Sequence, residues 1–163
     1  MSVSIATRNL TPRAKQIAAA STSLSARISF DLTMEEAWPD VAPGIVPFHN
    51  LVLVQYPTPK TKTASGIILS EETRTVVQAN SVVVKVIALG PVAFCNRETL
   101  VPWKEGKWCK PGDFVRVGKY DPDKWEVRLG DNTDDGVVVF GLVEDLNLKG
   151  LVTANPLSIV AYV

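Results

Sequence analysis

Short apolar segments separated by turn residues dominate the chain from Ile45 to its end. Most of these segments are rich in β-branched residues, and proline, glycine and aspartate fill the gaps between them. The segments expected to be strands are Leu51–Tyr56, Val82–Leu89, Phe114–Val117, Trp125–Leu129, Val137–Phe140 and Ser158–Val163. No helical pattern alternates with them, which argues against an α/β sheet. The sequence therefore predicts an all-β domain over residues 45–163, built as a small barrel or sandwich.

Residues 1–44 differ in character and are interpreted as an N-terminal arm. The first 30 residues contain four basic residues and no acidic one. Thr11 as N-cap and Pro12 at the first helical position are compatible with a helix running to Ile28, although the serines and threonine at 21–23 weaken it. An arginine-rich, serine-rich and acid-poor segment is also typical of an organellar transit peptide. We interpret the segment as an arm that docks on another surface, the alternative being a self-packed helix, and we expect residues 31–44 to be a linker.

Composition excludes several classes of protein. The 163 residues include 17 basic and 17 acidic side chains, and zero net charge disfavours a bulk nucleic-acid binder. The apolar fraction of 46% is sufficient for a buried core. No apolar run approaches the roughly 20 residues that span a bilayer. Two cysteines are too few for a disulfide scaffold, so a cytoplasmic location fits best.

Residues that could perform catalysis are sparse. The single histidine, His49, stands next to a strand start and is interpreted as a structural hydrogen-bonding group. Cys95 and Cys109 could pair or be ordinary buried thiols, and a metal site built from them and His49 would need a fourth ligand. No nucleophile elbow, phosphate-binding glycine loop or zinc-hydrolase motif is present in the sequence. We therefore expect neither an enzyme nor a cofactor or metal site.

Aromatic and basic residues are interleaved between Trp103 and Trp108. Stacking combined with positive charge is how small barrels hold single-stranded nucleic acid. The alternative is an exposed hairpin whose tryptophans pack on the barrel, and the shortness of the patch and the neutral chain favour it. We expect no nucleic-acid partner.

Residues 57–73 combine a polar stretch with an apolar triplet. The stretch from Pro57 to Ser65 is polar, basic and turn-prone, and we expect it to be a mobile loop. Directly after it stand Gly66, Ile67, Ile68 and Leu69. The triplet could be a short core strand, or it could be an anchor that enters a hydrophobic groove of another protein.

Taken in order, these motifs resemble a co-chaperonin of the GroES type. The proline-X-histidine strand from Pro47 to Val54, followed by the polar gap and by Gly66–Leu69, is similar to the start of that family. Val82–Gly90 resembles its strand ending in leucine-glycine, Lys110–Val115 its strand entry, and Leu157–Val163 its closing strand. Residues 91–110 do not match the family's roof hairpin, and residues 1–44 have no counterpart in the usual member. Such divergence is similar to co-chaperonins encoded by bacteriophages.

The resemblance implies a GroES-like β-barrel that forms a homo-oligomeric ring, a heptamer, and caps a double-ring chaperonin in the cytoplasm, which is the host cytoplasm for a phage protein. It would assist ATP-dependent folding of a client such as a capsid protein, with the ATP bound by the chaperonin. Gly66, Ile67, Ile68 and Leu69 would bind the chaperonin. Strand Ser158–Val163 would pair with Ile45–Val54 of the next subunit. The interface residues would be Val46, Leu51, Leu53, Ile159, Val160 and Tyr162.

A second interpretation belongs to a different class. The protein could be a virion structural protein that decorates or stabilises a phage capsid, using the β-domain as a knob and residues 1–44 as an arm between coat subunits. The length of the arm favours it.

Overall fold

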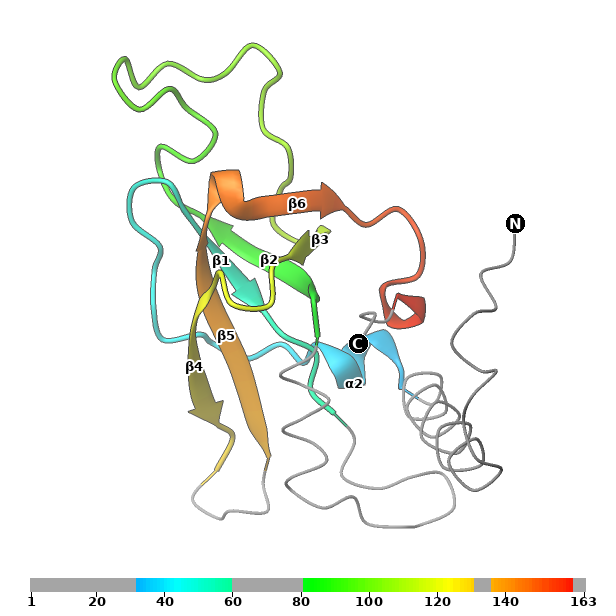
Figure 1. The fold of residues 1–163 in the computed structure, drawn as a ribbon. Helices are drawn as coiled ribbons and strands as arrows, with labels where there is room; N and C mark the ends of the chain where they lie inside the picture. Colours follow the sequence, from blue (N-terminus) through cyan, green and yellow to red (C-terminus); the bar gives the residue numbers. More distant parts are fainter. Residues whose placement is uncertain (1–31, 60–80, 131–135, 160–163) are drawn as a thin grey trace, which may run out of the picture.

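In a computed structural model, which describes residues 32–59, 81–130 and 136–159, the strands form one antiparallel sheet (Figure 1). The order across the sheet is β4-β5-β1-β2-β3-β6. The strands are β1 (Leu51–Gln55), β2 (Val83–Leu89), β3 (Phe114–Val117), β4 (Asp123–Arg128), β5 (Val137–Glu144) and β6 (Leu148–Leu151). The helical elements are α2 (Met34–Ala37) and the 3-10 turns η1 (Asp145–Asn147) and η2 (Pro156–Ser158). The prediction of an all-β domain is confirmed.

Strand β1 lies at the centre of the sheet and is apolar on both faces. It pairs with β2 on one side and with β5 on the other. Val52 and Val54 belong to the larger core cluster, whereas Leu53 packs with Val138 and Phe140 in a second cluster. Because neighbouring side chains on a strand point to opposite faces, this division places one cluster on each face of β1. A strand buried on both faces is expected to read as a continuous apolar run, as Leu51–Val54 does.

The sheet is open rather than closed into a barrel. Among the described strands, β4 pairs with β5 alone and β6 with β3 alone, so β4 and β6 are its two edges. Strand β4 carries Asp123, Lys124, Glu126 and Arg128. Charged side chains protect an edge strand from further pairing. The prediction of a closed barrel is therefore wrong for the described part of the chain.

Two elements near the C-terminus differ from the sequence prediction. Strand β6 was not expected, because a four-residue segment containing a lysine and a glycine carries little strand signal. The segment Ser158–Val163 was predicted to be a strand, but Ser158 is the last residue of the 3-10 turn η2. There Pro156 takes the first helical position and the Asn155 side chain accepts a hydrogen bond from Leu157 N at 3.0 Å. Residues 160–163 lie outside the described residues.

Residues 33–43, called the strap below, pack against the sheet. Thr33 and Glu36 form a reciprocal capping box that starts α2. Ala37 and Trp38 at its end are buried, at 0% and 4% exposure. This part of the expected linker is therefore docked on the domain. The N-terminal helix predicted up to Ile28 lies outside the described residues.

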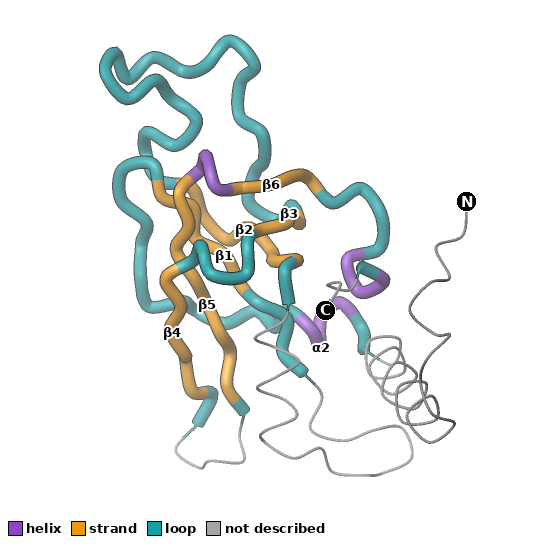
Figure 2. Tube along the Cα trace, in the orientation of Figure 1, coloured by secondary structure: helices purple, strands orange, loops and turns teal. Residues whose placement is uncertain are grey.

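Residues 91–113, called the upper loop below, form a long excursion between β2 and β3 (Figure 2). It rises from the sheet with only one isolated bridge, between Cys95 and Pro102. A loop of this length inside a small domain is commonly functional.

Within the described ranges, no helix is long and apolar enough to cross a lipid bilayer.

Candidate functional site

The connection between β1 and β2 contains the motif predicted to bind a chaperonin. Gly66, Ile67, Ile68 and Leu69 themselves lie outside the described residues, so the structure describes the base of the connection and not the motif. The base leaves the sheet after Tyr56, whose amide donates to Val139 O at 2.9 Å. Thr58 N then donates to Ala37 O of the strap at 2.7 Å. The backbone is therefore held by hydrogen bonds at Tyr56 and Thr58, where it leaves the sheet.

Three exposed apolar residues precede β1, and we call them the entry patch: Ile45, Val46 and Phe48. Val46 is 75% exposed and Phe48 is 78% exposed. The backbone turns at His49, which has a φ of 51°, and Leu51 N donates to Phe48 O at 3.0 Å. This turn sets the entry patch apart from β1. Large, neighbouring, exposed apolar side chains are typical of an interaction surface.

The residues predicted to form a subunit interface divide into two groups. Val46 is exposed, and Ile159 is partly so, at 36%. Leu53 is 1% exposed and belongs to the second core cluster, while Leu51 is half-buried. Val160 and Tyr162 lie outside the described residues.

Both edges of β1 are already paired within one chain, with β2 and β5. A strand from another subunit could not add to Leu51–Val54 without displacing one of them. Addition of Ser158–Val163 would therefore have to involve the segment upstream of β1, where the carbonyls of Phe48, His49 and Asn50 already accept hydrogen bonds within the chain.

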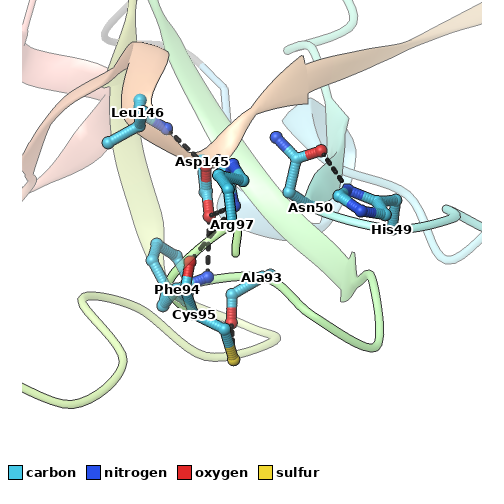
Figure 3. A network of polar contacts seen from close by, with 8 residues as sticks. All are labelled: His49, Asn50, Ala93, Phe94, Cys95, Arg97, Asp145 and Leu146. Atoms are coloured by element: carbon cyan, nitrogen blue, oxygen red, sulfur yellow. Dashed lines mark hydrogen bonds and ion pairs between the residues drawn. The ribbon is translucent and has the colours of Figure 1, made fainter. Parts of the chain in front are cut away.

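A buried carboxylate, that of Asp145, connects the end of β5 to the start of the upper loop (Figure 3). It is fully buried and accepts hydrogen bonds from Phe94 N at 2.7 Å and from Leu146 N at 2.8 Å. Arg97 donates to both of its oxygens, one bond being 3.2 Å long. A two-pronged arginine contact is among the stronger polar interactions in proteins. The upper loop is therefore anchored where it begins.

The environment of Asp145 favours its charged form. Burial by itself would raise the pKa of Asp145, but the hydrogen bonds from Arg97 and Phe94 N, the charge of Arg97 and the Asn50 side chain hold that pKa below its usual range. Asn50 also accepts from Asp145 N through its backbone, and its Oδ1 lies 2.8 Å from His49 Nδ1. The network thus joins the turn at the entry patch to the upper loop.

Three aromatic rings pack together at the base of the upper loop. The ring centroids of Trp103 and Trp108 are 5.0 Å apart, and Phe94 lies 6.3 Å from Trp103 and 5.6 Å from Trp108. Trp108 Nε1 donates to Glu105 Oε2 at 3.0 Å. The tryptophans therefore contact one another and the core residue Phe94, as in the hairpin alternative, while Leu100 and Val101 on the same loop are exposed.

The cysteines and the histidine are not gathered into one site. Cys95 and Cys109 are both buried free thiols. Burial, with the nearby charge of Asp113, raises the pKa of Cys109 to about 11, so it is a neutral thiol near pH 7. His49 is exposed and contacts Asn50. Within the ranges that the structure describes, no group of His, Cys, Asp and Glu residues is arranged to hold a metal ion.

No family model and no curated protein matches the chain in sequence. The functional argument therefore depends on the residues and the geometry given above.

Sequence reasoning missed Arg97 and Asp145. They stand 48 positions apart, so no local spacing connects them. The available signal was weak: Asp145 follows a charged neighbour, Glu144, at the end of an apolar strand, where an acidic residue ordinarily faces solvent.

Proposed function

We propose that the protein is a co-chaperonin, a homo-oligomeric lid that caps a double-ring chaperonin through Gly66–Leu69 and assists ATP-dependent folding of a client such as a phage capsid protein. The observation that carries the proposal is the place of this motif in the topology. It lies between β1 and β2, which pair directly from Val52↔Leu89 to Gln55↔Lys85. Because that pairing is made by residues outside the connection, the triplet is not needed to join the two strands. This supports the anchor interpretation over the core-strand interpretation.

Weak single contacts suit a lid that must also be released. Burying each of the three aliphatic side chains contributes about 1.5–3 kcal/mol before other terms. Ordering the surrounding segment on binding takes back about 2–5 kcal/mol. One motif therefore binds weakly, whereas several on one ring bind tightly through effective concentration. A change of state in the chaperonin would then release all of them together.

The entry patch supports the oligomeric part of the proposal. Its apolar side chains are exposed in the single chain, on the segment from Ile45 to Phe48. A head-to-tail contact between this segment and Ser158–Val163 of the next copy would generate a ring if the rotation from copy to copy closes on itself. Each contact would cover apolar surface that is otherwise in water.

Capture by a double-ring chaperonin tests the proposal. The purified protein is mixed with the chaperonin in the presence of ATP or ADP, and complexes are separated by size and viewed by negative-stain microscopy. We expect nucleotide-dependent capture, lost when Ile67, Ile68 and Leu69 are all changed to serine. A matched control is Leu100→Ser with Val101→Ser, which removes aliphatic side chains from the upper loop, where both are exposed. Undiminished capture of the triple variant contradicts the proposal.

A capsid-decorating structural protein is the second candidate. The observation favouring it is the strap, because its buried residues attach an N-terminal arm firmly to the β-domain. An arm that bears load between coat subunits requires such an attachment. Binding to assembled capsids without nucleotide, and no capture by the chaperonin, would favour this candidate over the lid.

A further inference from the structure

The outer edge of β6 has backbone groups that point away from the sheet. Gly150 of β6 pairs with Arg116 of β3, and Val152 N donates to Phe114 O at 2.8 Å. Because hydrogen bonding alternates along an antiparallel ladder, the N–H and C=O of Leu151, which lies between these two pairs, point away from β3. No described residue forms a backbone hydrogen bond with either group. This edge can therefore accept a further strand.

The side chains along this edge suit an apolar strand. Leu151 is 52% exposed, and Leu146, just before β6, is 55% exposed. A Cβ placed on Gly150 would meet nothing within 4 Å, so another backbone can approach closely there. Covering this edge with an apolar segment would remove both leucines from water.

The entry patch is an apolar segment whose backbone is available for pairing. Ile45 and Val46 make no backbone hydrogen bond with any described residue, and their side chains are exposed. Pro47 follows them and has no N–H to donate. If Val46 lies opposite Leu151 in an antiparallel pair, Pro47 lies opposite Gly150, at a position where no hydrogen bonds are exchanged. In this register the proline loses nothing and its ring faces the open glycine.

The charges near the edge favour the entry patch over the other strands that a second copy offers. Arg116 and Lys149 are both exposed on β3 and β6. Pairing of two β6 strands would bring these basic residues of both copies together, and β4 is charged at four of its six positions. Residues 33–53 contain three acidic residues and no lysine or arginine. The segment before β1 is therefore complementary to the β6 edge in charge as well as in hydrophobicity.

We propose that β6 is the strand to which Ile45–Pro47 of a second copy adds, antiparallel and with Val46 opposite Leu151. Strands β2 and β3 separate β1 from β6 within one chain, so the pairing joins different copies head to tail. The inference rests on the oligomeric part of the proposed function and names the strand that the entry patch contacts. Ser158–Val163 follows β6 after six residues, so both segments can contact the same neighbour.

Intermolecular disulfide formation tests this register in the full-length protein. Val46→Cys protein is mixed with tagged Leu151→Cys protein and oxidised mildly, and covalent dimers are separated by denaturing electrophoresis. Opposite residues of a hydrogen-bonded pair have Cα atoms about 5.5 Å apart, within the range that a disulfide spans. The control partner is Leu129→Cys, because Leu129 is 45% exposed and follows β4 at the other edge of the sheet. The native cysteines, Cys95 and Cys109, are buried.

We expect the mixed dimer of Val46→Cys with Leu151→Cys to form at least about fivefold faster than that with Leu129→Cys, because only the first pair is held at disulfide distance. Equal rates for the two mixtures would overturn the inference.

A proline substitution gives a second measurement that introduces no cysteine. Leu151→Pro removes an outward N–H and no bond to β3. Glu126→Pro is the matched control: Val139, opposite Glu126, accepts from Tyr56 N and so faces β1, which leaves the Glu126 N–H pointing outward from β4. Light scattering should show that Leu151→Pro assembles less than the unmodified protein at equal concentration, whereas Glu126→Pro assembles normally. Equal assembly of the two proline variants would contradict the role of β6.

Failure of this inference can be distinguished from failure of the proposed function. A ring that forms without preferential linkage of positions 46 and 151 leaves the lid function standing and shows that the β6 pairing is wrong. Preferential linkage without capture by the chaperonin supports the pairing and contradicts the lid. A protein that stays monomeric and forms no such link contradicts both the pairing and the ring.

Discussion

The buried side chain of Asp145 connects separate parts of the domain. It is fully buried, and it joins β5, the turn at His49 and the start of the upper loop. A charged group in such a position is tolerated because each of its oxygens is supplied with donors. Its contribution to stability should therefore depend on its charge, and hence on pH.

Replacing Asp145 with Asn tests this dependence. Burial by itself would raise the pKa of Asp145. The hydrogen bonds from Arg97 and Phe94 N nevertheless hold the pKa of this carboxyl in the folded protein below its pKa in the unfolded chain. The stabilisation is thus present above the unfolded pKa of about 4 and is lost as pH falls through the folded value. At pH 7 we expect Asp145→Asn to lower the free energy of unfolding by about 1–3 kcal/mol. The difference from the unmodified protein should shrink below about pH 4.

Urea unfolding followed between neutral and acidic pH measures the effect. Asp123→Asn is the control, because Asp123 is an exposed carboxylate on the edge strand β4. It should change the free energy of unfolding little at any pH. A difference between Asp145→Asn and the unmodified protein that stays constant down to pH 3 would contradict the charge-based account.

Tyr56 presents the opposite case, a buried polar group with no partner among the residues that the structure describes. Its side chain is fully buried, and none of these residues makes a hydrogen bond with its hydroxyl. Burial, followed by the charge of Asp121, raises the pKa of Tyr56, so the hydroxyl stays neutral. The Lys124 ammonium lies 4.4 Å from the ring centroid and interacts with the ring rather than with the oxygen.

Removing this hydroxyl should therefore stabilise the protein. We expect Tyr56→Phe to raise the free energy of unfolding by up to about 1 kcal/mol, because a desolvated, unbonded oxygen is eliminated. Tyr120→Phe is the matched control, since Tyr120 is 87% exposed, and it should have no measurable effect. Thermal and urea unfolding report both variants. A loss of stability in Tyr56→Phe would show that the hydroxyl is bonded, for example to a water molecule.

At the scale of elements, the sequence identified those whose signal is local. Leu51–Gln55, Val83–Leu89 and Phe114–Val117 were predicted within one residue at each end, because continuous or alternating β-branched residues bounded by Gly and Pro leave little alternative. Strand β6 was missed because its stability comes from pairing with β3 and not from its own composition.

The strap was predicted to be a linker from its prolines and acids, although the Thr33–Glu36 spacing of a capping box and the large apolar Trp38 were both present. Of the candidate site, only the motif Gly66–Leu69 could be predicted from the sequence. The hydrogen bonds at the base of the β1–β2 connection could not, because they join segments that are distant in the sequence.

The junction between β2 and the upper loop depends on a glycine. A Cβ placed on Gly90 would lie 2.3 Å from His49 O and 2.9 Å from both Leu51 O and Phe48 O. These are backbone atoms that cannot rotate away. We expect Gly90→Ala to lower the free energy of unfolding by about 1–3 kcal/mol, the usual effect of overpacking.

Gly150 in β6 offers the matched control. A Cβ there would meet nothing within 4 Å, so Gly150→Ala should be nearly neutral. Both variants are compared by urea unfolding with the slope of the transition checked for constancy. Equal stability of the two variants would mean that the backbone around His49 adapts more easily than the close approach indicates.

At the scale of the whole molecule, the main question is whether the chain remains a monomer or assembles with further copies through the entry patch. The monomer leaves Val46 and Phe48 in water, at 75% and 78% exposure, next to the turn at His49. Both edges of β1 are used within the chain, so in the proposed ring a neighbouring copy would contact the residues that precede β1. If it does, polar substitution of the entry patch should dissociate the assembly while leaving the fold intact.

We therefore expect Val46→Ser combined with Phe48→Ser to convert a ring into monomers at a protein concentration where the unmodified protein is assembled. Because both side chains are exposed in one chain, the free energy of unfolding of the resulting monomer should change by no more than about 0.5 kcal/mol per site. Tyr120→Ser, which also removes an exposed ring, should leave the assembly whole. Light scattering coupled to size-exclusion chromatography gives the mass, and deletion of Ser158–Val163 should reproduce the loss of mass. A ring that survives both changes would place the subunit contact elsewhere, since neither the entry patch nor the C-terminal segment would then be needed to close it.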